Sequence, residues 1–196
     1  MFYIDWRDIQ LNFFNGTNTI IGNAGNATSK GIEFEGTFTP MAGLTFSANG
    51  AYTDAKITGL VPGAQGGAVV GDELPYNSKW AGALRADYYF PVQTDYTGNV
   101  GLGLRYKSSF ATTFPHDTGT RYYVLPEESF VDFRAGIAFK GYALNLQILN
   151  LFDEHKLSQA SEYLGTSQAV ADALGQPVAL GYTPRRTYGL SLTAQF

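Results

Sequence analysis

Charged side chains recur at alternate positions in several segments of the chain, so they are the first candidates for chemistry. Four are acids and four are bases: Glu33, Glu35, Asp87, Asp132, Arg85, Arg105, Lys107 and Arg134. Alternate residues of a strand share one face, so these side chains can pair across neighbouring strands or line a path for a charged substrate. We favour the ion-paired wall, because equal numbers of opposite charges need no substrate to balance them.

No residue pattern predicts an enzyme. His116 and His155 lie in separate predicted loops, and Glu127–Glu128 lies at the edge of a strand. The chain has no Cys, which excludes thiol catalysis, a thiolate metal site and a disulfide framework. It also lacks a nucleophile elbow, a phosphate-binding glycine loop and the H-E-x-x-H zinc motif. We therefore expect neither catalysis nor a cofactor or metal site.

The composition indicates an aromatic-rich surface. Aromatic residues make up 15% of the chain, as do charged residues, and hydrophobic residues make up 44%. The formal net charge is −4 and no basic stripe stands out, so we do not expect nucleic acid as a partner. No stretch approaches the ~18 consecutive apolar residues of a membrane-spanning helix. Spanning strands stay compatible with this pattern, because they carry apolar side chains only at every second position.

The last predicted strand, residues 187–196, shows this alternation most clearly. One face carries Tyr188, Leu190, Leu192, Ala194 and Phe196, and the other carries small or polar residues. An apolar face that ends on an exposed aromatic residue is poorly suited to water and well suited to lipid. This strand therefore predicts a membrane-spanning sheet.

Seven similar segments precede it, at about 2–14, 32–39, 44–53, 80–90, 100–107, 131–139 and 142–148. Short turns are expected at Pro40–Gly43, Pro91–Gly98 and Lys140–Gly141, and long loops at about 56–78, 111–126 and 152–183. Asn15–Gly16 is a tight turn that breaks this alternation. Short periplasmic turns opposite long extracellular loops are typical of outer-membrane barrels. The pattern predicts an all-β fold: a transmembrane, antiparallel, up-and-down β-barrel segment of about eight long strands.

Two local features are predicted within these segments. The apolar row of the first strand switches from even to odd positions between Trp6 and Ile9, which indicates a bulge near Arg7–Asp8. In the longest loop, Ser167–Leu174 can form a short helix that begins at Ser167 and ends before Gly175.

Aromatic residues gather near both ends of the predicted strands. Near the short turns lie Phe38, Phe46, Phe90, Phe139, Tyr142 and Phe196. Near the opposite ends lie Tyr52, Trp80, Tyr106 and Tyr188. A tilted strand from Trp80 to Phe90 crosses roughly 25 Å, which matches the apolar band of outer-membrane barrels. A soluble β-sandwich is the alternative, but its strands are usually only about 5–6 residues long.

The first residues, Met1–Asp8, contain no basic region followed by an apolar run, so they are not a secretory signal peptide. An outer-membrane protein needs such a signal. We therefore expect this chain to be part of a longer protein.

Four motifs resemble stretches of TonB-dependent receptors, in the order and with the spacing of that family. They are Gly22–Ala27 followed by Lys30–Gly36, Pro40–Leu44 leading to Ala51–Ala55, Asn150–Glu154, and Tyr182–Tyr188. The resemblance implies a bacterial outer-membrane barrel of about 22 strands, filled by a plug domain. It implies uptake of ferric siderophores, cobalamin, haem or carbohydrates, driven by the TonB complex through the plug. Residues 1–196 would supply the C-terminal barrel segment, without the plug.

The resemblance also suggests ligands, partners and site residues. The ligand that we expect is a ferric siderophore or a similar small molecule, and the candidate contacts in the extracellular loops are His116, Tyr122, Tyr123 and Tyr163. Tyr188, Leu190, Leu192 and Phe196 resemble the C-terminal signal read by the barrel-assembly machinery. Outer-membrane lipid is the remaining partner. A stand-alone eight-stranded barrel with a structural or adhesion role, and a soluble sugar-binding sandwich, are the alternatives.

Overall fold

The chain folds almost entirely into strands in a computed structural model, which describes residues 1–14, 19–60, 67–117, 121–162, 173 and 178–194. The strands are β1 (Phe2–Phe14), β2 (Thr19–Met41), β3 (Leu44–Leu60), β4 (Trp80–Gln93), β5 (Tyr96–Lys107), β6 (Phe110–Ala111), β7 (Val124–Leu125), β8 (Glu128–Phe139), β9 (Tyr142–Leu149), β10 (Leu157–Glu162), β11 (Val178–Tyr182) and β12 (Thr187–Ala194). Among the described residues, no helix has the length and apolar character needed to cross a membrane.

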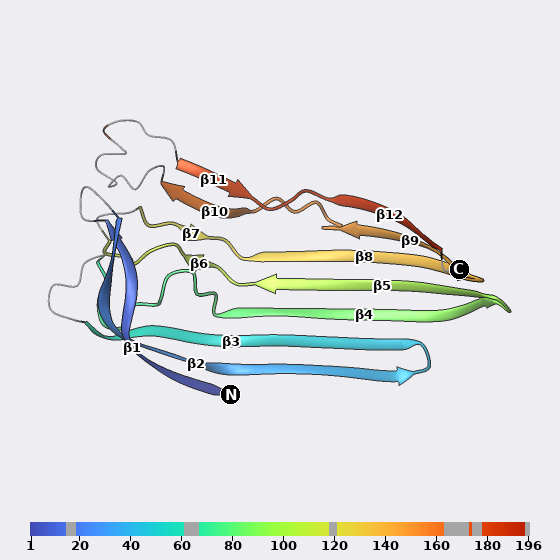
Figure 1. Ribbon diagram of the computed structural model, residues 1–196, viewed down its shortest axis with the longest axis horizontal. Coiled ribbons are helices and arrows are strands. Elements are labelled where there is room, and N and C mark those ends of the chain that lie inside the picture. Colours follow the sequence, from blue (N-terminus) through green and yellow to red (C-terminus); the bar gives the residue numbers. More distant parts are fainter. Residues whose placement is uncertain (15–18, 61–66, 118–120, 163–172, 174–177, 195–196) are drawn as a thin grey trace.

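Eight of these strands form one antiparallel sheet in the order β1-β2-β3-β4-β5-β8-β9-β12 (Figure 1). The predicted all-β, antiparallel, up-and-down fold is confirmed. Two small two-stranded sheets, β6–β7 and β10–β11, lie within the long connections. In the described part of the chain, β1 pairs only with β2 and β12 pairs only with β9, so both edges of the main sheet are open.

Short turns lie at one end of the sheet and long connections at the other (Figure 1). Lys140 and Gly141 both have a positive φ, 43° and 82°, which confirms the predicted two-residue hairpin. The turn between β4 and β5 is shorter than expected, because the two strands continue to Gln93 and from Tyr96. The predicted Asn15–Gly16 turn and most of the predicted helix 167–174 lie outside the described residues.

The bulge predicted in β1 is present. The pairing of β1 with β2 shifts between Trp6 and Ile9, and Asp8 has a φ of 54°. The backbone N–H of Asp8, displaced from the ladder, donates a hydrogen bond to Oδ1 of Asn26 at 3.3 Å. The extra residue keeps Trp6 and Ile9 on one face of the sheet, although their sequence positions differ in parity.

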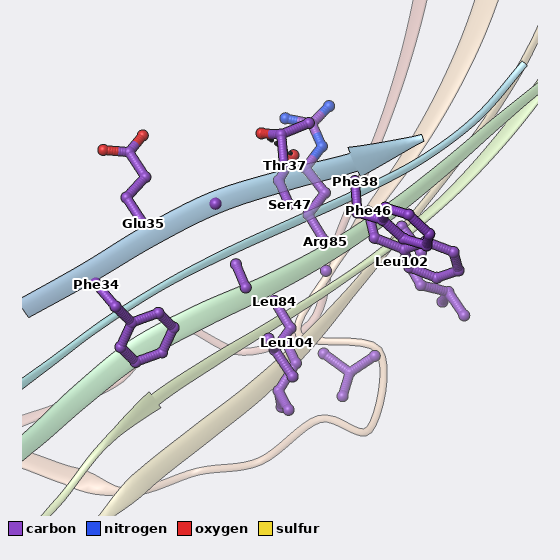
Figure 2. A pocket seen from close by; sticks show the side chains of 15 residues that line it. Phe34, Glu35, Thr37, Phe38, Phe46, Ser47, Leu84, Arg85, Leu102 and Leu104 are labelled. Carbon is purple, nitrogen blue, oxygen red and sulfur yellow. Dashed lines mark hydrogen bonds between the residues drawn. The ribbon is translucent and has the colours of Figure 1, made fainter. Parts of the chain in front are cut away.

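The wall has one apolar and one polar face. Figure 2 shows Phe34, Leu84 and Leu104 on one side of strands β2–β5, with Glu35 and Arg85 on the other. The same strands border a hollow of about 650 Å³. Apolar side chains of the wall are widely exposed, which suits lipid rather than water. The buried apolar side chains instead gather toward the end of the sheet that carries the long connections.

Candidate functional site

Asn150 organises the junction between β9 and the last long connection. Its side chain is buried, and its Nδ2 donates hydrogen bonds to the carbonyl oxygens of Glu154 at 2.8 Å and Pro184 at 3.0 Å. Its Oδ1 accepts a hydrogen bond from the backbone N–H of Glu154 at 2.9 Å. Its own backbone N–H donates to Oδ1 of Asp132 on β8 at 3.0 Å. One side chain therefore ties the start of the connection to its end.

Asp153 holds the other side of this junction. Its Oδ1 accepts a hydrogen bond from the backbone N–H of Arg186 at 2.9 Å, and Arg185 Nη1 lies 3.3 Å from its Oδ2. The Arg186 guanidinium donates to the carbonyl oxygen of Leu151 and lies 5.7 Å from the centre of the Tyr188 ring. The hydrogen bond from Arg186, with the positive charges of both arginines, holds the pKa of Asp153 below its ordinary value.

This shift predicts an acid-dependent contribution of Asp153 to stability. A carboxyl group with a lowered pKa in the folded state stabilises the fold above its unfolded pKa, and this contribution is lost as pH falls through the folded pKa. The difference in urea midpoint between wild type and Asp153→Asn should stay constant from neutral pH to about pH 4 and then disappear. A difference that persists in stronger acid would show that the carboxylate charge is not its cause.

Two buried apolar clusters join the long connections to one another. The first consists of Ile9, Ala27, Ile57 and Phe114. The second consists of Phe110, Leu125 and Ala160. Through Phe114, the connection between β5 and β8 packs against β1, β2 and β3, while Ala160 brings β10 against β6 and β7. The described parts of these connections therefore form a packed rim at this end of the sheet.

Ion pairs run across the polar face of the central strands. Arg85 Nε lies 2.6 Å from Asp87 Oδ2, and Arg134 Nη2 lies 3.1 Å from Asp87 Oδ1. Arg105 Nε lies 3.2 Å from Asp132 Oδ2. These contacts confirm the predicted ion-paired wall for five of its eight charged residues.

The remaining three charges of the predicted wall are not ion-paired within the described structure. Lys107 Nζ lies 4.0 Å from the centre of the Phe110 ring, a cation–π contact. Glu33 and Glu35 form no ion pair with any described residue and leave an acidic stretch on the polar face of β2.

A row of apolar side chains on β1 interrupts the polar face. Phe2, Ile4 and Trp6 pair with alternate residues of β2 that share the face of Glu33. The Phe2 ring covers Gly31, where an added Cβ would lie 2.8 Å from the ring. Ile4 is 53% exposed and Trp6 is 52% exposed. An apolar row on an otherwise polar face is a candidate ligand contact.

The family of the chain is established by comparison with known proteins. A family model described as TonB dependent receptor-like, beta-barrel matches residues 1–151, well over half of the chain. The chain belongs to this TonB-dependent receptor family. No curated protein matches the chain.

Solved TonB-dependent receptor structures share its fold. The chain is similar to the ferric yersiniabactin uptake receptor FyuA from Yersinia pestis, with a TM-score of 0.74 and 13% identity. It is similar to BauA, the ferric preacinetobactin receptor from Acinetobacter baumannii, with a TM-score of 0.65 and 17% identity. It is also similar to a mutant of the ferric enterobactin receptor PfeA from Pseudomonas aeruginosa, with a TM-score of 0.62 and 18% identity. Each match covers 99% of this chain but only 26–28% of the other.

Membership of the TonB-dependent receptor family orients the sheet. In transmembrane barrels the apolar face meets lipid, the polar face lines the interior, and the longer loops are extracellular. The ion-paired face therefore faces the lumen, and the packed rim lies at the extracellular end. Phe2, Ile4 and Trp6 lie on the inner side of this mouth, continuous with the buried cluster around Phe114.

Three of the four ligand contacts predicted from sequence lie in the long connection between β5 and β8. His116 and Tyr122 are exposed, whereas Tyr123 is half-buried and packs against the second apolar cluster. Within the described residues no hydrogen bond or ring contact joins His116 to either tyrosine, and Tyr163 lies outside those residues. These four assignments remain predictions. Among the described residues, no three His, Asp or Glu side chains gather as metal ligands.

Sequence reasoning did not single out Trp6 or Asn150 as site residues. The parity switch after Trp6 was visible, but only the pairing register assigns its side chain to the lumen face. Asn150 belongs to a recognised motif, yet its hydrogen bonds reach Pro184, far along the chain. Of the proposed assembly signal, Tyr188, Leu190 and Leu192 are exposed on β12, and Phe196 lies outside the described residues.

Proposed function

We propose that residues 1–196 form the C-terminal barrel segment of a bacterial outer-membrane receptor that takes up a ferric siderophore. The TonB complex would drive uptake through a plug domain of the whole receptor. Family membership supports a transport receptor rather than an enzyme. The three similar structures are receptors for ferric siderophores, which favours this ligand class.

The observation that carries the proposal is the apolar row at the mouth. Ile4 and Trp6 present exposed apolar surface on the lumen face beside the extracellular rim, and the half-buried Phe2 continues their row. Siderophores combine polar iron-chelating groups with apolar or aromatic backbones, so such a row can contact the ligand while the polar wall stays hydrated. Trp6 offers the largest flat surface, and aromatic side chains often dominate the energy of an interface.

We expect Trp6→Ala to weaken siderophore binding by about tenfold, because an anchor of this kind contributes roughly 1–2 kcal/mol. The whole receptor would be titrated with the ferric forms of yersiniabactin, preacinetobactin and enterobactin, and iron uptake would be measured in starved cells that lack the native receptor gene. Tyr3→Ala is the matched control, since Tyr3 is 67% exposed on the opposite face of the same strand. Failure of all three ligands to bind, or equal effects of the two variants, would overturn this proposal.

We propose further that β12 supplies the signal for barrel assembly. Leu190 and Leu192 are 73% and 71% exposed on its lipid face, and Tyr188 lies near its extracellular end. With Phe196, they would be read by the barrel-assembly machinery before the strand closes the barrel.

A further inference from the structure

A cluster of charged side chains lies beside the middle of β2, on the extracellular half of β3 and just before β4. It contains three lysines and two acids: Lys30, Lys56, Lys79, Asp54 and Glu73. Lys56 Nζ lies 3.0 Å from Asp54 Oδ1, and Lys30 Nζ lies 4.0 Å from Asp54 Oδ2. Lys79 pairs with Glu73. We call these five residues the lysine cluster.

The lysine cluster lies on the lipid side of the wall. Lys30 is directly opposite Asp54, and two residues further along the strands Ile32 is opposite Tyr52 on the same apolar face. Glu73 is opposite Lys56, which places it on this side as well. None of these residues belongs to the lumen face that carries the proposed ligand contacts.

The lysine cluster also lies at the height of lipid headgroups. Immediately below it, the rings of Tyr52 and Trp80 pack with their centres 4.7 Å apart. Paired aromatics at the extracellular end of a barrel wall belong to the girdle that lies at the membrane–water interface. The side chains just beyond this pair are therefore level with the phosphates of the outer leaflet.

The charge balance of the lysine cluster favours an anion. Three ammonium groups share two carboxylates, and Asp54, whose side chain is only 13% exposed, is shared by two of the lysines. The lysine side chains keep 59%, 41% and 40% of their surface exposed, so they can donate further hydrogen bonds. The hydrogen bond to Glu73 and the nearby charge of Asp54 raise the pKa of Lys79, which keeps it cationic.

The excess of lysines over acids is confined to the part of the wall around β2 and β3. On the same face of β5, Tyr106 donates a hydrogen bond to Glu127 at 3.0 Å, so an acid occupies the corresponding position there. A phosphorylated lipid would therefore find its cationic partners at β2–β3 and not along the whole rim.

We propose that the lysine cluster binds the phosphate groups of a phosphorylated glycolipid in the outer leaflet. Its ammonium groups would donate to the phosphate oxygens, and the acyl chains would run down the apolar face beside Ile32 and Phe34. The inference rests on the outer-membrane location proposed above. It is independent of the ligand proposed for the lumen.

The test is a titration of the detergent-purified receptor with bisphosphorylated lipid A, followed by native mass spectrometry. Each lysine near a membrane surface contributes about fivefold in affinity, so the triple variant Lys30→Gln, Lys56→Gln, Lys79→Gln should bind at least tenfold more weakly. The double variant Lys140→Gln, Lys156→Gln is the control and should bind like wild type. Glu73→Gln removes a competing carboxylate and should bind two- to fivefold more tightly, an effect that misfolding would not produce.

Unchanged lipid affinity in the triple variant would overturn the proposal, as would equal binding of lipid A stripped of its phosphates. Displacement of the lipid by an equal concentration of inorganic phosphate would assign the site to free phosphate instead. Siderophore binding by the triple variant should stay at the wild-type level, because the cluster and Trp6 lie on opposite faces. A receptor that binds lipid A as expected but no siderophore would contradict only the proposed function.

Discussion

Asn150→Ala should lower the free energy of unfolding by about 3–5 kcal/mol, since the substitution leaves several buried polar groups without partners. The amide of Asn150 makes three hydrogen bonds, two with the backbone of Glu154 and one with the carbonyl oxygen of Pro184. Each buried polar group left unpaired costs about 1–3 kcal/mol, and water that enters the junction offsets part of this. Asn150 also has a φ of 53°, a conformation that costs Ala about 1 kcal/mol more than Gly.

The measurement is urea unfolding in lipid vesicles, followed by tryptophan fluorescence and by gel mobility without heating. Asn150→Gly separates the two contributions, because Gly relieves the positive φ but restores no hydrogen bond. Asn26→Ala is the control: Asn26 is exposed, and among the described residues its side chain accepts one long hydrogen bond, 3.3 Å from the backbone nitrogen of Asp8, so its loss should cost under about 1 kcal/mol. An Asn150→Ala variant within about 1 kcal/mol of wild type would show that the amide does not hold the connection closed.

Alternation in the sequence predicts the wall of this protein well. Every second residue is apolar along β12 and from Val100 to Tyr106 in β5, and a one-residue slip in the pairing would turn such a row away from the lipid. The Lys140–Gly141 hairpin is explained by local chemistry, because its two-residue turn needs a positive φ at both positions and Gly adopts one at no steric cost. The bulge near Asp8 could also be predicted from the sequence, because an extra residue shifts the apolar row beyond it from even to odd positions.

The mouth could not be predicted in the same way. The row of Phe2, Ile4 and Trp6 has the same alternation as a lipid-facing row, and only the register with β2 assigns it to the lumen. The hairpin of β10 and β11 lies where a loop was expected, because its short strands are stabilised by packing of Ala160 and not by a long apolar row. Long-range contacts of this kind leave no periodic trace in the sequence.

The polar wall depends on glycine in a way that its charges alone do not reveal. Gly101 on β5 lies directly between Asp87 on β4 and Arg134 on β8. The two charged side chains meet at 3.1 Å across the strand, over the space that a side chain at Gly101 would fill. Gly103, two residues further on the same face, also lies between two charged residues, Arg85 and Asp132. Their side chains leave the space above Gly103 free.

Gly101→Ala should therefore destabilise the protein by about 1–3 kcal/mol, whereas Gly103→Ala should stabilise it by about 0.5–1 kcal/mol. An added Cβ at Gly101 would lie 2.5 Å from Asp87 Oδ1 and 3.2 Å from Arg134 Nη2, so the carboxylate of Asp87 must move and the ion pair is strained. At Gly103 the nearest atoms are 4.0 Å away, and Ala gains because it loses less backbone entropy than Gly on folding. Urea unfolding of both variants, repeated in an Asp87→Ala background, measures the coupling, and most of the Gly101→Ala cost should vanish there. Two outcomes would contradict this prediction: equal stability changes for Gly101→Ala and Gly103→Ala, or a Gly101→Ala cost that persists in the Asp87→Ala background. Either would show that the ion pair does not require a glycine between Asp87 and Arg134.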